Sequence, residues 1–269
     1  MPGKRAQARG SAMLLAIDVG NTNTVIGIAR DGSGWDHIWR LSTIRTPFGV
    51  DWMPTLRAFA ERDQVDLRQV NRIAIGSVVP VVTNALTDLA RSWLHTEPLI
   101  ISARLQLPIR LGQDAPEQVG VDRIANMVAA RAITTEPVIV VDLGTATKVE
   151  ALDGSGTFRG GAIAPGIEVM TEALTSKAAR LFSIPLVLPD QAIGRNTVEA
   201  MQSGIVLGHF LMIEGLIHHI AAELEAASPV VIVTGGHAEE LASPFRRFGV
   251  HNPTLTLDGI RLIADLNTT

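Results

Sequence analysis

A short sequence pattern occurs twice in this chain of 269 residues, at positions close to half the chain length apart. In residues 17–25 and again in residues 141–149, an apolar stretch leads through Asp, an apolar residue and Gly into a polar turn and a second apolar stretch. The two aspartates are Asp18 and Asp142. One copy would carry little weight, because Asp-x-Gly is common in turns at the ends of strands. Two copies at this spacing predict a duplicated fold with two similar lobes.

The rest of the chain alternates between strand and helix patterns, which is typical of an α/β protein. Short apolar runs predict strands at 13–18, 24–29, 35–41, 72–79, 98–101, 138–141, 145–152, 157–164 and 230–233. Apolar residues at helical spacing predict helices at 50–62, 82–94, 121–133, 167–177, within 196–226, after Gly236 and at 256–266. We therefore expect each lobe to contain a mixed central sheet flanked by helices.

The expected domains are an N-terminal lobe at 13–115 and a C-terminal lobe at 116–269, joined by a Pro- and Gly-containing connection within 102–119. Residues 1–12 are basic, as the start of a signal peptide would be. The apolar run that follows them ends at Asp18 and is too short for the apolar core of a signal peptide. We therefore expect residues 1–12 to be a flexible extension.

The composition excludes several classes of function. The chain has no cysteine, which excludes disulfides, thiolate metal sites and cysteine nucleophiles. The formal net charge of -4 argues against a nucleic-acid-binding protein, and no uninterrupted apolar run approaches the roughly 18 residues of a membrane span. The adjacent His218 and His219 are interpreted as a helix surface, because neighbouring residues point to different helix faces. We expect a cytoplasmic protein that acts on a small molecule.

The repeated turns have the chemistry of phosphate loops. Gly20 and Gly144 allow consecutive backbone N–H groups to converge on an anion, and the polar residues 21–24 add amide and hydroxyl groups. Asp18 is suited to hold hydrated Mg²⁺, which binds one or two carboxylates together with water and phosphate. The P-loop pattern G-x-x-x-x-G-K-[ST] does not occur. The sequence therefore indicates a different kind of phosphate site.

A third glycine site follows the strand predicted at 230–233, where Gly235 and Gly236 would let an adenine ring lie against the backbone. Two phosphate loops followed by such a glycine pair resemble the actin/hexokinase/Hsp70 superfamily of ATP-binding folds. That resemblance implies two ribonuclease H-like, actin-like lobes with the ATP site in the cleft between them.

Six motifs make the resemblance more specific. They are similar, in order, to the motifs of type III pantothenate kinase, and they cover nearly the whole chain after residue 12. The motifs are DVGNTNTVIG at 18–27, GVDRIANMVAA at 120–130, DLGTAT at 142–147, GGAIAPGI at 160–167, NTVEAMQSG at 196–204 and VTGG at 233–236.

This resemblance implies a homodimer that transfers the γ-phosphate of ATP to the 4′-hydroxyl of pantothenate, the first step of coenzyme A biosynthesis. It implies Mg²⁺ and a monovalent cation, K⁺ or NH₄⁺, as cofactors, with Asp142 as a ligand of the monovalent cation. Asp122 matches the catalytic base. The positions that match ATP-binding residues are Asp18, Val19, Gly20, Asn21, Thr22, Asn23, Thr24, Val25 and Thr145. Those that match substrate-binding residues are Gly120, Val121, Asp122, Arg123 and Thr197.

The local sequence supports some of these roles and leaves alternatives open. Asp122 and Arg123 lie at the predicted start of a helix, whose positive end favours a carboxylate. An ionised carboxylate can accept the proton of an attacking hydroxyl, and an arginine can bind a substrate carboxylate. Alternatively, Asp122 only stabilises the helix end and Arg123 is solvated. Asn196 and Thr197 could likewise be no more than helix caps.

The sequence departs from the family pattern at three places. Gln113 stands where the family commonly has an aromatic residue, and the chain contains no Tyr. Gln113 is therefore a further candidate for a substrate contact. Val121 replaces the alanine of the usual Gly-Ala-Asp-Arg core, and Lys148 and Glu150 replace the usual Thr and Asp of the second phosphate loop.

Lys148 leads to two hypotheses. Its ammonium group could take the place of the monovalent cation and make activity independent of K⁺, or its side chain could point outward, because side chains alternate along a strand. The departures also leave two alternative functions open. One is a kinase of another hydroxy acid or amide, and the other is a catalytically silent, nucleotide-binding regulator.

Overall fold

The computed structural model describes residues 13–30, 34–43, 45, 52–178, 180–236 and 248–267. These residues form two compact units. The first unit takes its residues from 13–106, 120–125 and 256–267, and the second from 107–119 and 126–255. These ranges divide the chain differently from the expected lobes at 13–115 and 116–269. The predicted extension 1–12 and the helix predicted after Gly236 lie outside the described residues.

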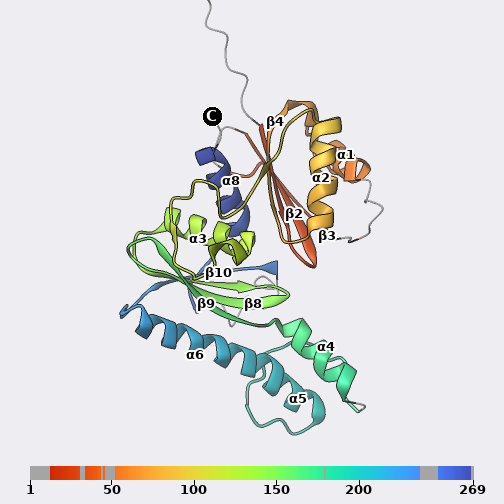
Figure 1. Cartoon of the computed structure of the whole chain (residues 1–269). Helices are drawn as coiled ribbons and strands as arrows, with labels where there is room; N and C mark the ends of the chain where they lie inside the picture. Colours follow the sequence, from red (N-terminus) through yellow and green to blue (C-terminus); the bar gives the residue numbers. More distant parts are fainter. Residues whose placement is uncertain are drawn as a thin grey trace, which may run out of the picture. The chain divides into compact units, whose positions relative to one another are not determined.

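The first unit is built on a five-stranded mixed sheet of order β3-β2-β1-β4-β5 (Figure 1). The first three strands pair antiparallel, while β4 pairs parallel to β1 and β5 parallel to β4. The strands are β1 (Met13–Val19), β2 (Asn23–Arg30), β3 (His37–Ser42), β4 (Val70–Ser77) and β5 (Leu99–Ile100). The five strands predicted for this part of the chain are confirmed, including the hairpin between β1 and β2.

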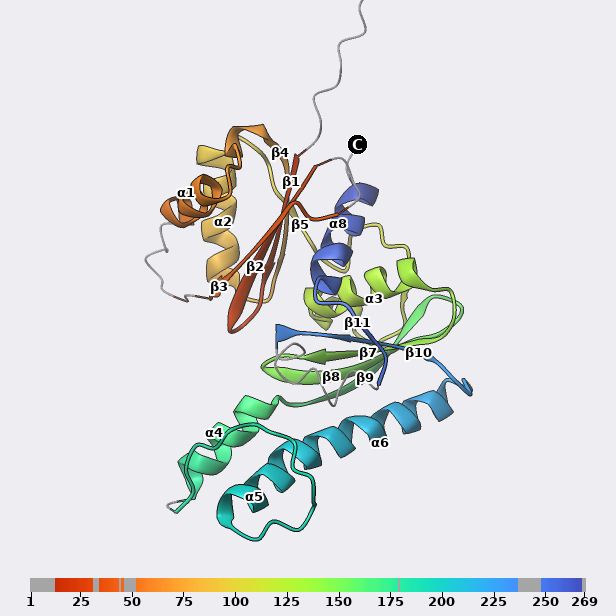
Figure 2. The same cartoon turned by 180° about the vertical axis from the view of Figure 1, so that it is seen from behind.

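Both faces of this sheet are covered by helices (Figure 2). Leu15, Ile17 and Val19 alternate along β1 and pack into a core with α1 (Trp52–Arg62) and α2 (Pro80–Trp93). On the opposite face lies α8 (Leu255–Asn267), which approaches so closely that an added Cβ at Gly76 would lie 2.8 Å from Ile260 Cδ1. A short 3₁₀ helix, Leu67–Gln69, precedes β4.

Helix α8 is fixed to the first unit by polar contacts as well as by packing. Trp35 Nε1 donates to Asp258 Oδ1 at 2.8 Å, and Arg72 donates to Asp265 Oδ1 at 2.8 Å. Gly259 lies directly against the backbone of Ala125 in helix α3 (Val121–Ile133), where any side chain would overlap the carbonyl group. The C-terminal helix therefore holds the start of α3 in place.

The second unit contains a six-stranded sheet of order β11-β10-β7-β8-β9-β6. Its strands are β6 (Arg110–Leu111), β7 (Val138–Leu143), β8 (Ala146–Leu152), β9 (Thr157–Pro165), β10 (Val230–Thr234) and β11 (Val250–His251). From β9 to β11 the pairing repeats that of β3 to β5: three antiparallel strands, then two parallel ones. The duplicated α/β fold predicted from the repeated pattern is therefore confirmed. The two-residue strands β6 and β11 were not predicted.

One face of the second sheet packs against α6 (Gly208–Glu223) (Figure 2), and α4 (Ile167–Lys177) and α5 (Thr197–Gln202) contribute to the same hydrophobic core. Residues Ser203–Leu207 join α5 to α6 as a π-helical turn, so Thr197–Glu223 is continuously helical, as predicted. A 3₁₀ helix, Pro116–Gln118, precedes α3. Among the described residues, Thr197–Glu223 is the one helix long and apolar enough to cross a membrane, and 28% of its most apolar window is buried.

A buried histidine lies at the centre of the second unit. His209 of α6 is buried, its Nε2 lies 3.0 Å from Thr147 Oγ1 of β8, and its Nδ1 lies 3.3 Å from Met170 Sδ of α4. Burial disfavours the charged imidazolium and lowers the pKa of His209 below its ordinary value. The neutral imidazole of His209 therefore links α6 to β8 and α4.

The His209 environment predicts that stability decreases in mild acid. Because its pKa is lower in the folded state, the unfolded chain binds more protons just below the ordinary histidine pKa of about 6.5, so stability falls as the pH drops below that value. Thermal denaturation between pH 5 and 8 measures this slope. We expect His209→Gln to flatten the dependence of stability on pH and to lower the free energy of unfolding by about 1–3 kcal/mol at pH 7.5 through lost hydrogen bonding.

The control is His218→Gln, on the exposed face of α6, which should keep the wild-type dependence of stability on pH. An unchanged pH dependence in His209→Gln would contradict the interpretation.

Candidate active site

The first predicted phosphate loop is the tight turn between β1 and β2. Gly20 N donates to Asn23 O at 2.9 Å, and Thr43 at the end of β3 closes the turn from the side. The Thr43 hydroxyl donates to Gly20 O at 2.9 Å and lies 2.9 Å from Thr24 Oγ1. Arg45 donates to the backbone and side-chain oxygens of Asn21. The loop is thus held by residues that come from the third strand and the segment after it.

Side chains of the predicted ATP-binding segment divide into two groups. Val19 and Thr24 are buried in the first unit, so only their backbone groups are available to a ligand. Asn21 and Thr22 are exposed at the tip of the turn. Asp18 is partly exposed near the end of β1, opposite Val25 of β2. Asp18 and the turn therefore present a carboxylate, backbone N–H groups and short polar side chains at one end of the sheet.

The second phosphate loop, Gly144–Thr145, joins β7 to β8 and is surrounded by other main chains. Gly166 N donates to Thr145 O at 2.9 Å, and any side chain at Gly166 would overlap the backbone of this loop. Gly235 follows β10 with φ 102° and touches the backbone of Leu143 in the same way. Glycine is required at Gly235 because this φ and this contact both exclude an L side chain. Gly235 therefore packs directly beside the second loop.

The predicted catalytic pair stands in the first turn of α3. Asp122 and Arg123 are partly exposed, and the helix begins with Ile124 N donating to Gly120 O at 3.1 Å. A Cβ added to Gly120 would lie 2.6 Å from Asp122 Oδ1. The Asp122 carboxylate therefore lies against the bare α-carbon of Gly120, near the positive end of the helix. Val121, the first residue of the helix, is also partly exposed.

An ion pair follows the second loop. Lys148 lies directly opposite Asp142 in the antiparallel pairing of β7 and β8, and its Nζ donates to Asp142 Oδ2 at 2.7 Å. The two side chains are only 15% and 12% exposed. The hypothesis that Lys148 points outward is therefore wrong, because the register places both side chains on the same face of the sheet.

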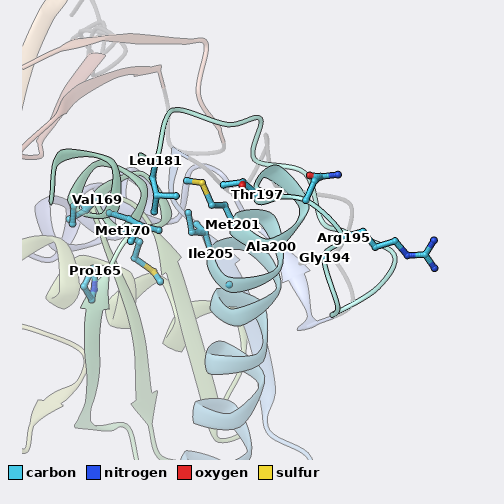
Figure 3. A pocket seen from close by; sticks show the side chains of 14 residues that line it. Pro165, Val169, Met170, Leu181, Gly194, Arg195, Thr197, Ala200, Met201 and Ile205 are labelled. Atoms are coloured by element: carbon cyan, nitrogen blue, oxygen red, sulfur yellow. The ribbon is translucent and has the colours of Figure 1, made fainter. Parts of the chain in front are cut away.

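Thr197 lines an open pocket of about 980 Å³ in the second unit (Figure 3). Most of its walls are apolar side chains of α4, α5 and the π-helical turn, among them Met170, Met201 and Ile205, while the Arg195 side chain extends away from them. The helix cap is Asn196, whose Oδ1 accepts a hydrogen bond from Glu199 N at 3.0 Å. Thr197 is the first helical residue, so its side chain is not needed as the cap.

Gln113, the residue at the unusual position, packs beside β9. Its Nε2 donates to Phe158 O at 2.8 Å. Its Oε1 is buried and has no hydrogen-bond partner among the described residues. A buried acceptor without a partner is costly, so this oxygen is suited to a donor on a bound ligand.

The predicted site residues thus fall into two groups, one in each unit. The first unit holds Asp18–Val25 and Gly120–Arg123, and the second unit holds Gln113, Asp142, Thr145, Lys148 and Thr197. Sequence reasoning missed Arg45 and Thr43, whose contacts with the first loop bridge more than twenty residues and leave no local pattern. The sequence analysis left the cap open between Asn196 and Thr197, and the structure assigns it to Asn196, with Glu199 three positions later as in a capping box.

The described residues contain no cluster of three or more His, Asp or Glu side chains suited to hold a metal ion. His218 and His219 are exposed on α6, as predicted. A single carboxylate such as Asp18 still fits Mg²⁺, because Mg²⁺ bound with a nucleotide takes most of its ligands from phosphate and water.

Two related α/β sheets, each with a glycine-bearing hairpin loop beside its central strand, give the chain a duplicated α/β fold of the actin/hexokinase-like class. A model of the family described as type III pantothenate kinase matches residues 14–219. The chain belongs to the type III pantothenate kinase family.

Curated relatives of this family align over almost the whole chain. The type III pantothenate kinase of Gluconobacter oxydans is 43% identical over 256 residues, which cover 95% of this chain and 94% of the relative. That of Roseiflexus sp. (strain RS-1) is 40% identical over 255 residues, covering 95% of this chain and 99% of the relative.

A more distant likeness exists among solved structures. The (R)-2-hydroxyglutaryl-CoA dehydratase component A of Acidaminococcus fermentans superposes with a TM-score of 0.54 at 13% identity, covering 95% of this chain and 96% of that chain. At this identity the likeness shows the fold alone. It agrees with the predicted fold class.

The contact between Gly120 and Asp122 generates a prediction for catalysis. In Gly120→Ala, the new Cβ would displace the Asp122 carboxylate, and a shift of about 1 Å in a catalytic group can cost about a hundred-fold in rate. We expect kcat to fall by roughly ten- to a hundred-fold while the melting temperature changes little. Steady-state kinetics and thermal denaturation measure these quantities. Gly34→Ala, where an added Cβ has open space around it, is the matched control, and wild-type kcat in Gly120→Ala would contradict the geometry.

Proposed function

We propose that this chain catalyses the transfer of the γ-phosphate of ATP to the 4′-hydroxyl of pantothenate. The observation that carries this proposal is the placement of Asp122 and Arg123 in the first turn of α3, within a family match that spans residues 14–219. The product, 4′-phosphopantothenate, belongs to the first step of coenzyme A biosynthesis. The substrates are small and water-soluble, so we also propose a cytoplasmic location.

ATP is bound, in this proposal, through the two hairpin loops. In the first loop, backbone N–H groups around Gly20 and the side chains of Asn21 and Thr22 donate hydrogen bonds to phosphate oxygens. Asp18 would be the residue that holds Mg²⁺ through water, and the ion would supply positive charge to offset that of the phosphates. Thr145 contributes a hydroxyl group from the second loop. The exposure of Asn21 and Thr22 supports these roles.

Asp122 acts as the general base. Its carboxylate accepts the proton of the 4′-hydroxyl as the oxygen attacks phosphorus, and it lies near the positive end of the helix. Arg123 carries a fixed fork of N–H donors that suits the carboxylate of pantothenate. Both residues are partly exposed, which leaves them accessible to a substrate.

Thr197 and Gln113 are the proposed substrate contacts of the second unit. Thr197 adds a hydroxyl group to an otherwise apolar pocket, which suits a substrate that combines methyl groups with polar ends. The buried Gln113 Oε1 would accept a hydrogen bond from an amide or hydroxyl group of the substrate. Because an amide replaces an aromatic side chain here, a related hydroxy acid or amide is the second candidate acceptor. Comparing kcat/KM for pantothenate with that for shortened and amide analogues decides between the two.

The proposed base predicts the effect of Asp122→Asn. Asparagine keeps the shape of the side chain but cannot accept the proton, and general base catalysis contributes about 10²- to 10⁴-fold. We expect kcat to fall by that factor, with KM for ATP and the melting temperature nearly unchanged. Coupled measurement of ADP release gives the rate. Asp88→Asn, an exposed residue of α2, is the control, and an Asp122→Asn enzyme with more than a tenth of wild-type kcat would rule out the assignment.

The second unit also exposes an apolar surface that we propose is covered by a second copy of the chain. The helix Thr197–Glu223 is strongly apolar, yet 28% of its most apolar window is buried. Leu211 on this helix is 52% exposed, and Ile193, beside the Thr197 pocket, is 83% exposed. Exposed apolar groups that continue from a substrate pocket are typical of an interface. This supports the homodimer that the family resemblance implies. A second subunit, rather than a membrane, would then cover the apolar surface of the helix.

A charge on this surface should separate the subunits. We expect the wild-type chain to have twice its monomer mass of 28.7 kDa in solution, and Leu211→Arg to have the monomer mass, because the charge would be buried without a partner. Light scattering coupled to size-exclusion chromatography measures the mass. Ile133→Arg, at a position with almost the same exposure on α3, should leave the dimer intact. A wild-type monomer, or a dimeric Leu211→Arg variant, would argue against this surface.

A further inference from the structure

Two carboxylates and one ammonium group lie on the same face of the second sheet. Lys148 is opposite Asp142 on β7, and Glu150 stands two positions further along β8. Since side chains alternate along a strand, all three project from this face. Glu150 is fully buried, and the Asp142 and Lys148 side chains are nearly so. This face therefore concentrates negative charge in a site with little solvent.

Such a site needs a positive charge. A buried carboxylate is strongly destabilising unless a cation or hydrogen-bond donors compensate it. The Lys148 ammonium provides the compensation, with its Nζ 2.7 Å from Asp142 Oδ2. Because the lysine is part of the chain, it is present at every moment and loses no translational freedom on binding, unlike an ion taken from solution.

A free monovalent cation does not fit these residues. It would need the Asp142 carboxylate as a ligand, and the Oδ2 of that carboxylate already accepts a charge-assisted hydrogen bond from Lys148. A second cation at the same carboxylate would lie within a few ångströms of the ammonium, at a position that is largely excluded from water, where repulsion between like charges is weakly screened.

The position of the pair gives it a role. Asp142 and Leu143 end β7 and lead directly into the Gly144–Thr145 loop, and Lys148 lies on the strand that leaves this loop. A contact between Asp142 and Lys148 therefore closes the base of the hairpin whose tip is proposed to contact ATP. Removing the positive charge would leave the Asp142 carboxylate at the base of that loop without the ammonium group opposite it, on the same face of the sheet as Glu150.

We propose that the Lys148 ammonium is a built-in replacement for the monovalent cation at Asp142, so that the kinase needs neither K⁺ nor NH₄⁺. Lys148 is a positioning residue: it holds Asp142 and the second phosphate loop and does not touch the reacting atoms. The proposal rests on the proposed function for its kinetic test, and a binding measurement tests it independently.

The test compares wild type with Lys148→Ala and Lys148→Met. Alanine removes the charge and opens space for an ion, whereas methionine removes the charge but fills most of the space. Initial rates with ATP and pantothenate are measured in KCl, NH₄Cl and choline chloride at equal ionic strength, after dialysis against choline chloride. We expect wild-type rates to agree within two-fold in all three salts. Lys148→Ala should be slow in choline chloride and at least ten-fold faster in KCl or NH₄Cl, and Lys148→Met should be slow in every salt.

Melting temperatures in the same salts give a readout that does not depend on turnover. An ion that binds only the folded state raises the melting temperature. We expect K⁺, relative to choline, to raise the melting temperature of Lys148→Ala by several degrees and to leave that of wild type unchanged. If pantothenate is not the acceptor, no salt supports turnover in any variant, but this difference in melting temperature persists. Three results would each overturn the proposal. They are a ten-fold activation of the wild type by K⁺, a rise in the wild-type melting temperature with K⁺, and a Lys148→Ala melting temperature that K⁺ does not change.

Discussion

Close contact between main chains is the constraint on which the second phosphate loop depends. Gly166 and Gly235 come from two different connections of the second unit, and each packs its bare α-carbon against the backbone around Gly144. Any side chain there would push these connections away from the loop. The first loop is held differently, by the Thr43 hydroxyl and by a short turn hydrogen bond. The duplicated fold therefore supports two similar loops with unrelated local contacts.

The duplicated hairpins also differ in their electrostatics. In the first hairpin Asp18 lies opposite the apolar side chain of Val25. In the second hairpin Asp142 lies opposite Lys148, which neutralises it within the chain. Asp18 and Asp142 thus occupy equivalent positions in the two hairpins. The residue opposite each carboxylate differs, because it is Val25 in the first hairpin and Lys148 in the second.

The proposed catalytic and substrate-binding residues lie at the starts of helices rather than in their middles. Asp122 stands in the first turn of α3, and Thr197 stands in the first turn of α5. Helix starts combine a positive end with N–H groups that have no partner within the helix, which suits anionic groups on enzyme or substrate. Packing holds these starts in place: Gly259 of α8 fixes α3, and the capping pair Asn196 and Glu199 fixes α5.

The sequence by itself determined the order of the main strands and helices, the duplication and the family, because these depend on local periodicity and on motifs that are contiguous in the chain. It also located Asp122 and Thr197 at helix starts. Only the tertiary structure decided the partner of Lys148, since a shift of one residue in the β7–β8 register would have turned this side chain to the other face. It likewise decided the contacts of Thr43 and Arg45 with the first loop and the buried oxygen of Gln113. These depend on which distant segments the fold brings together, and no local pattern encodes that.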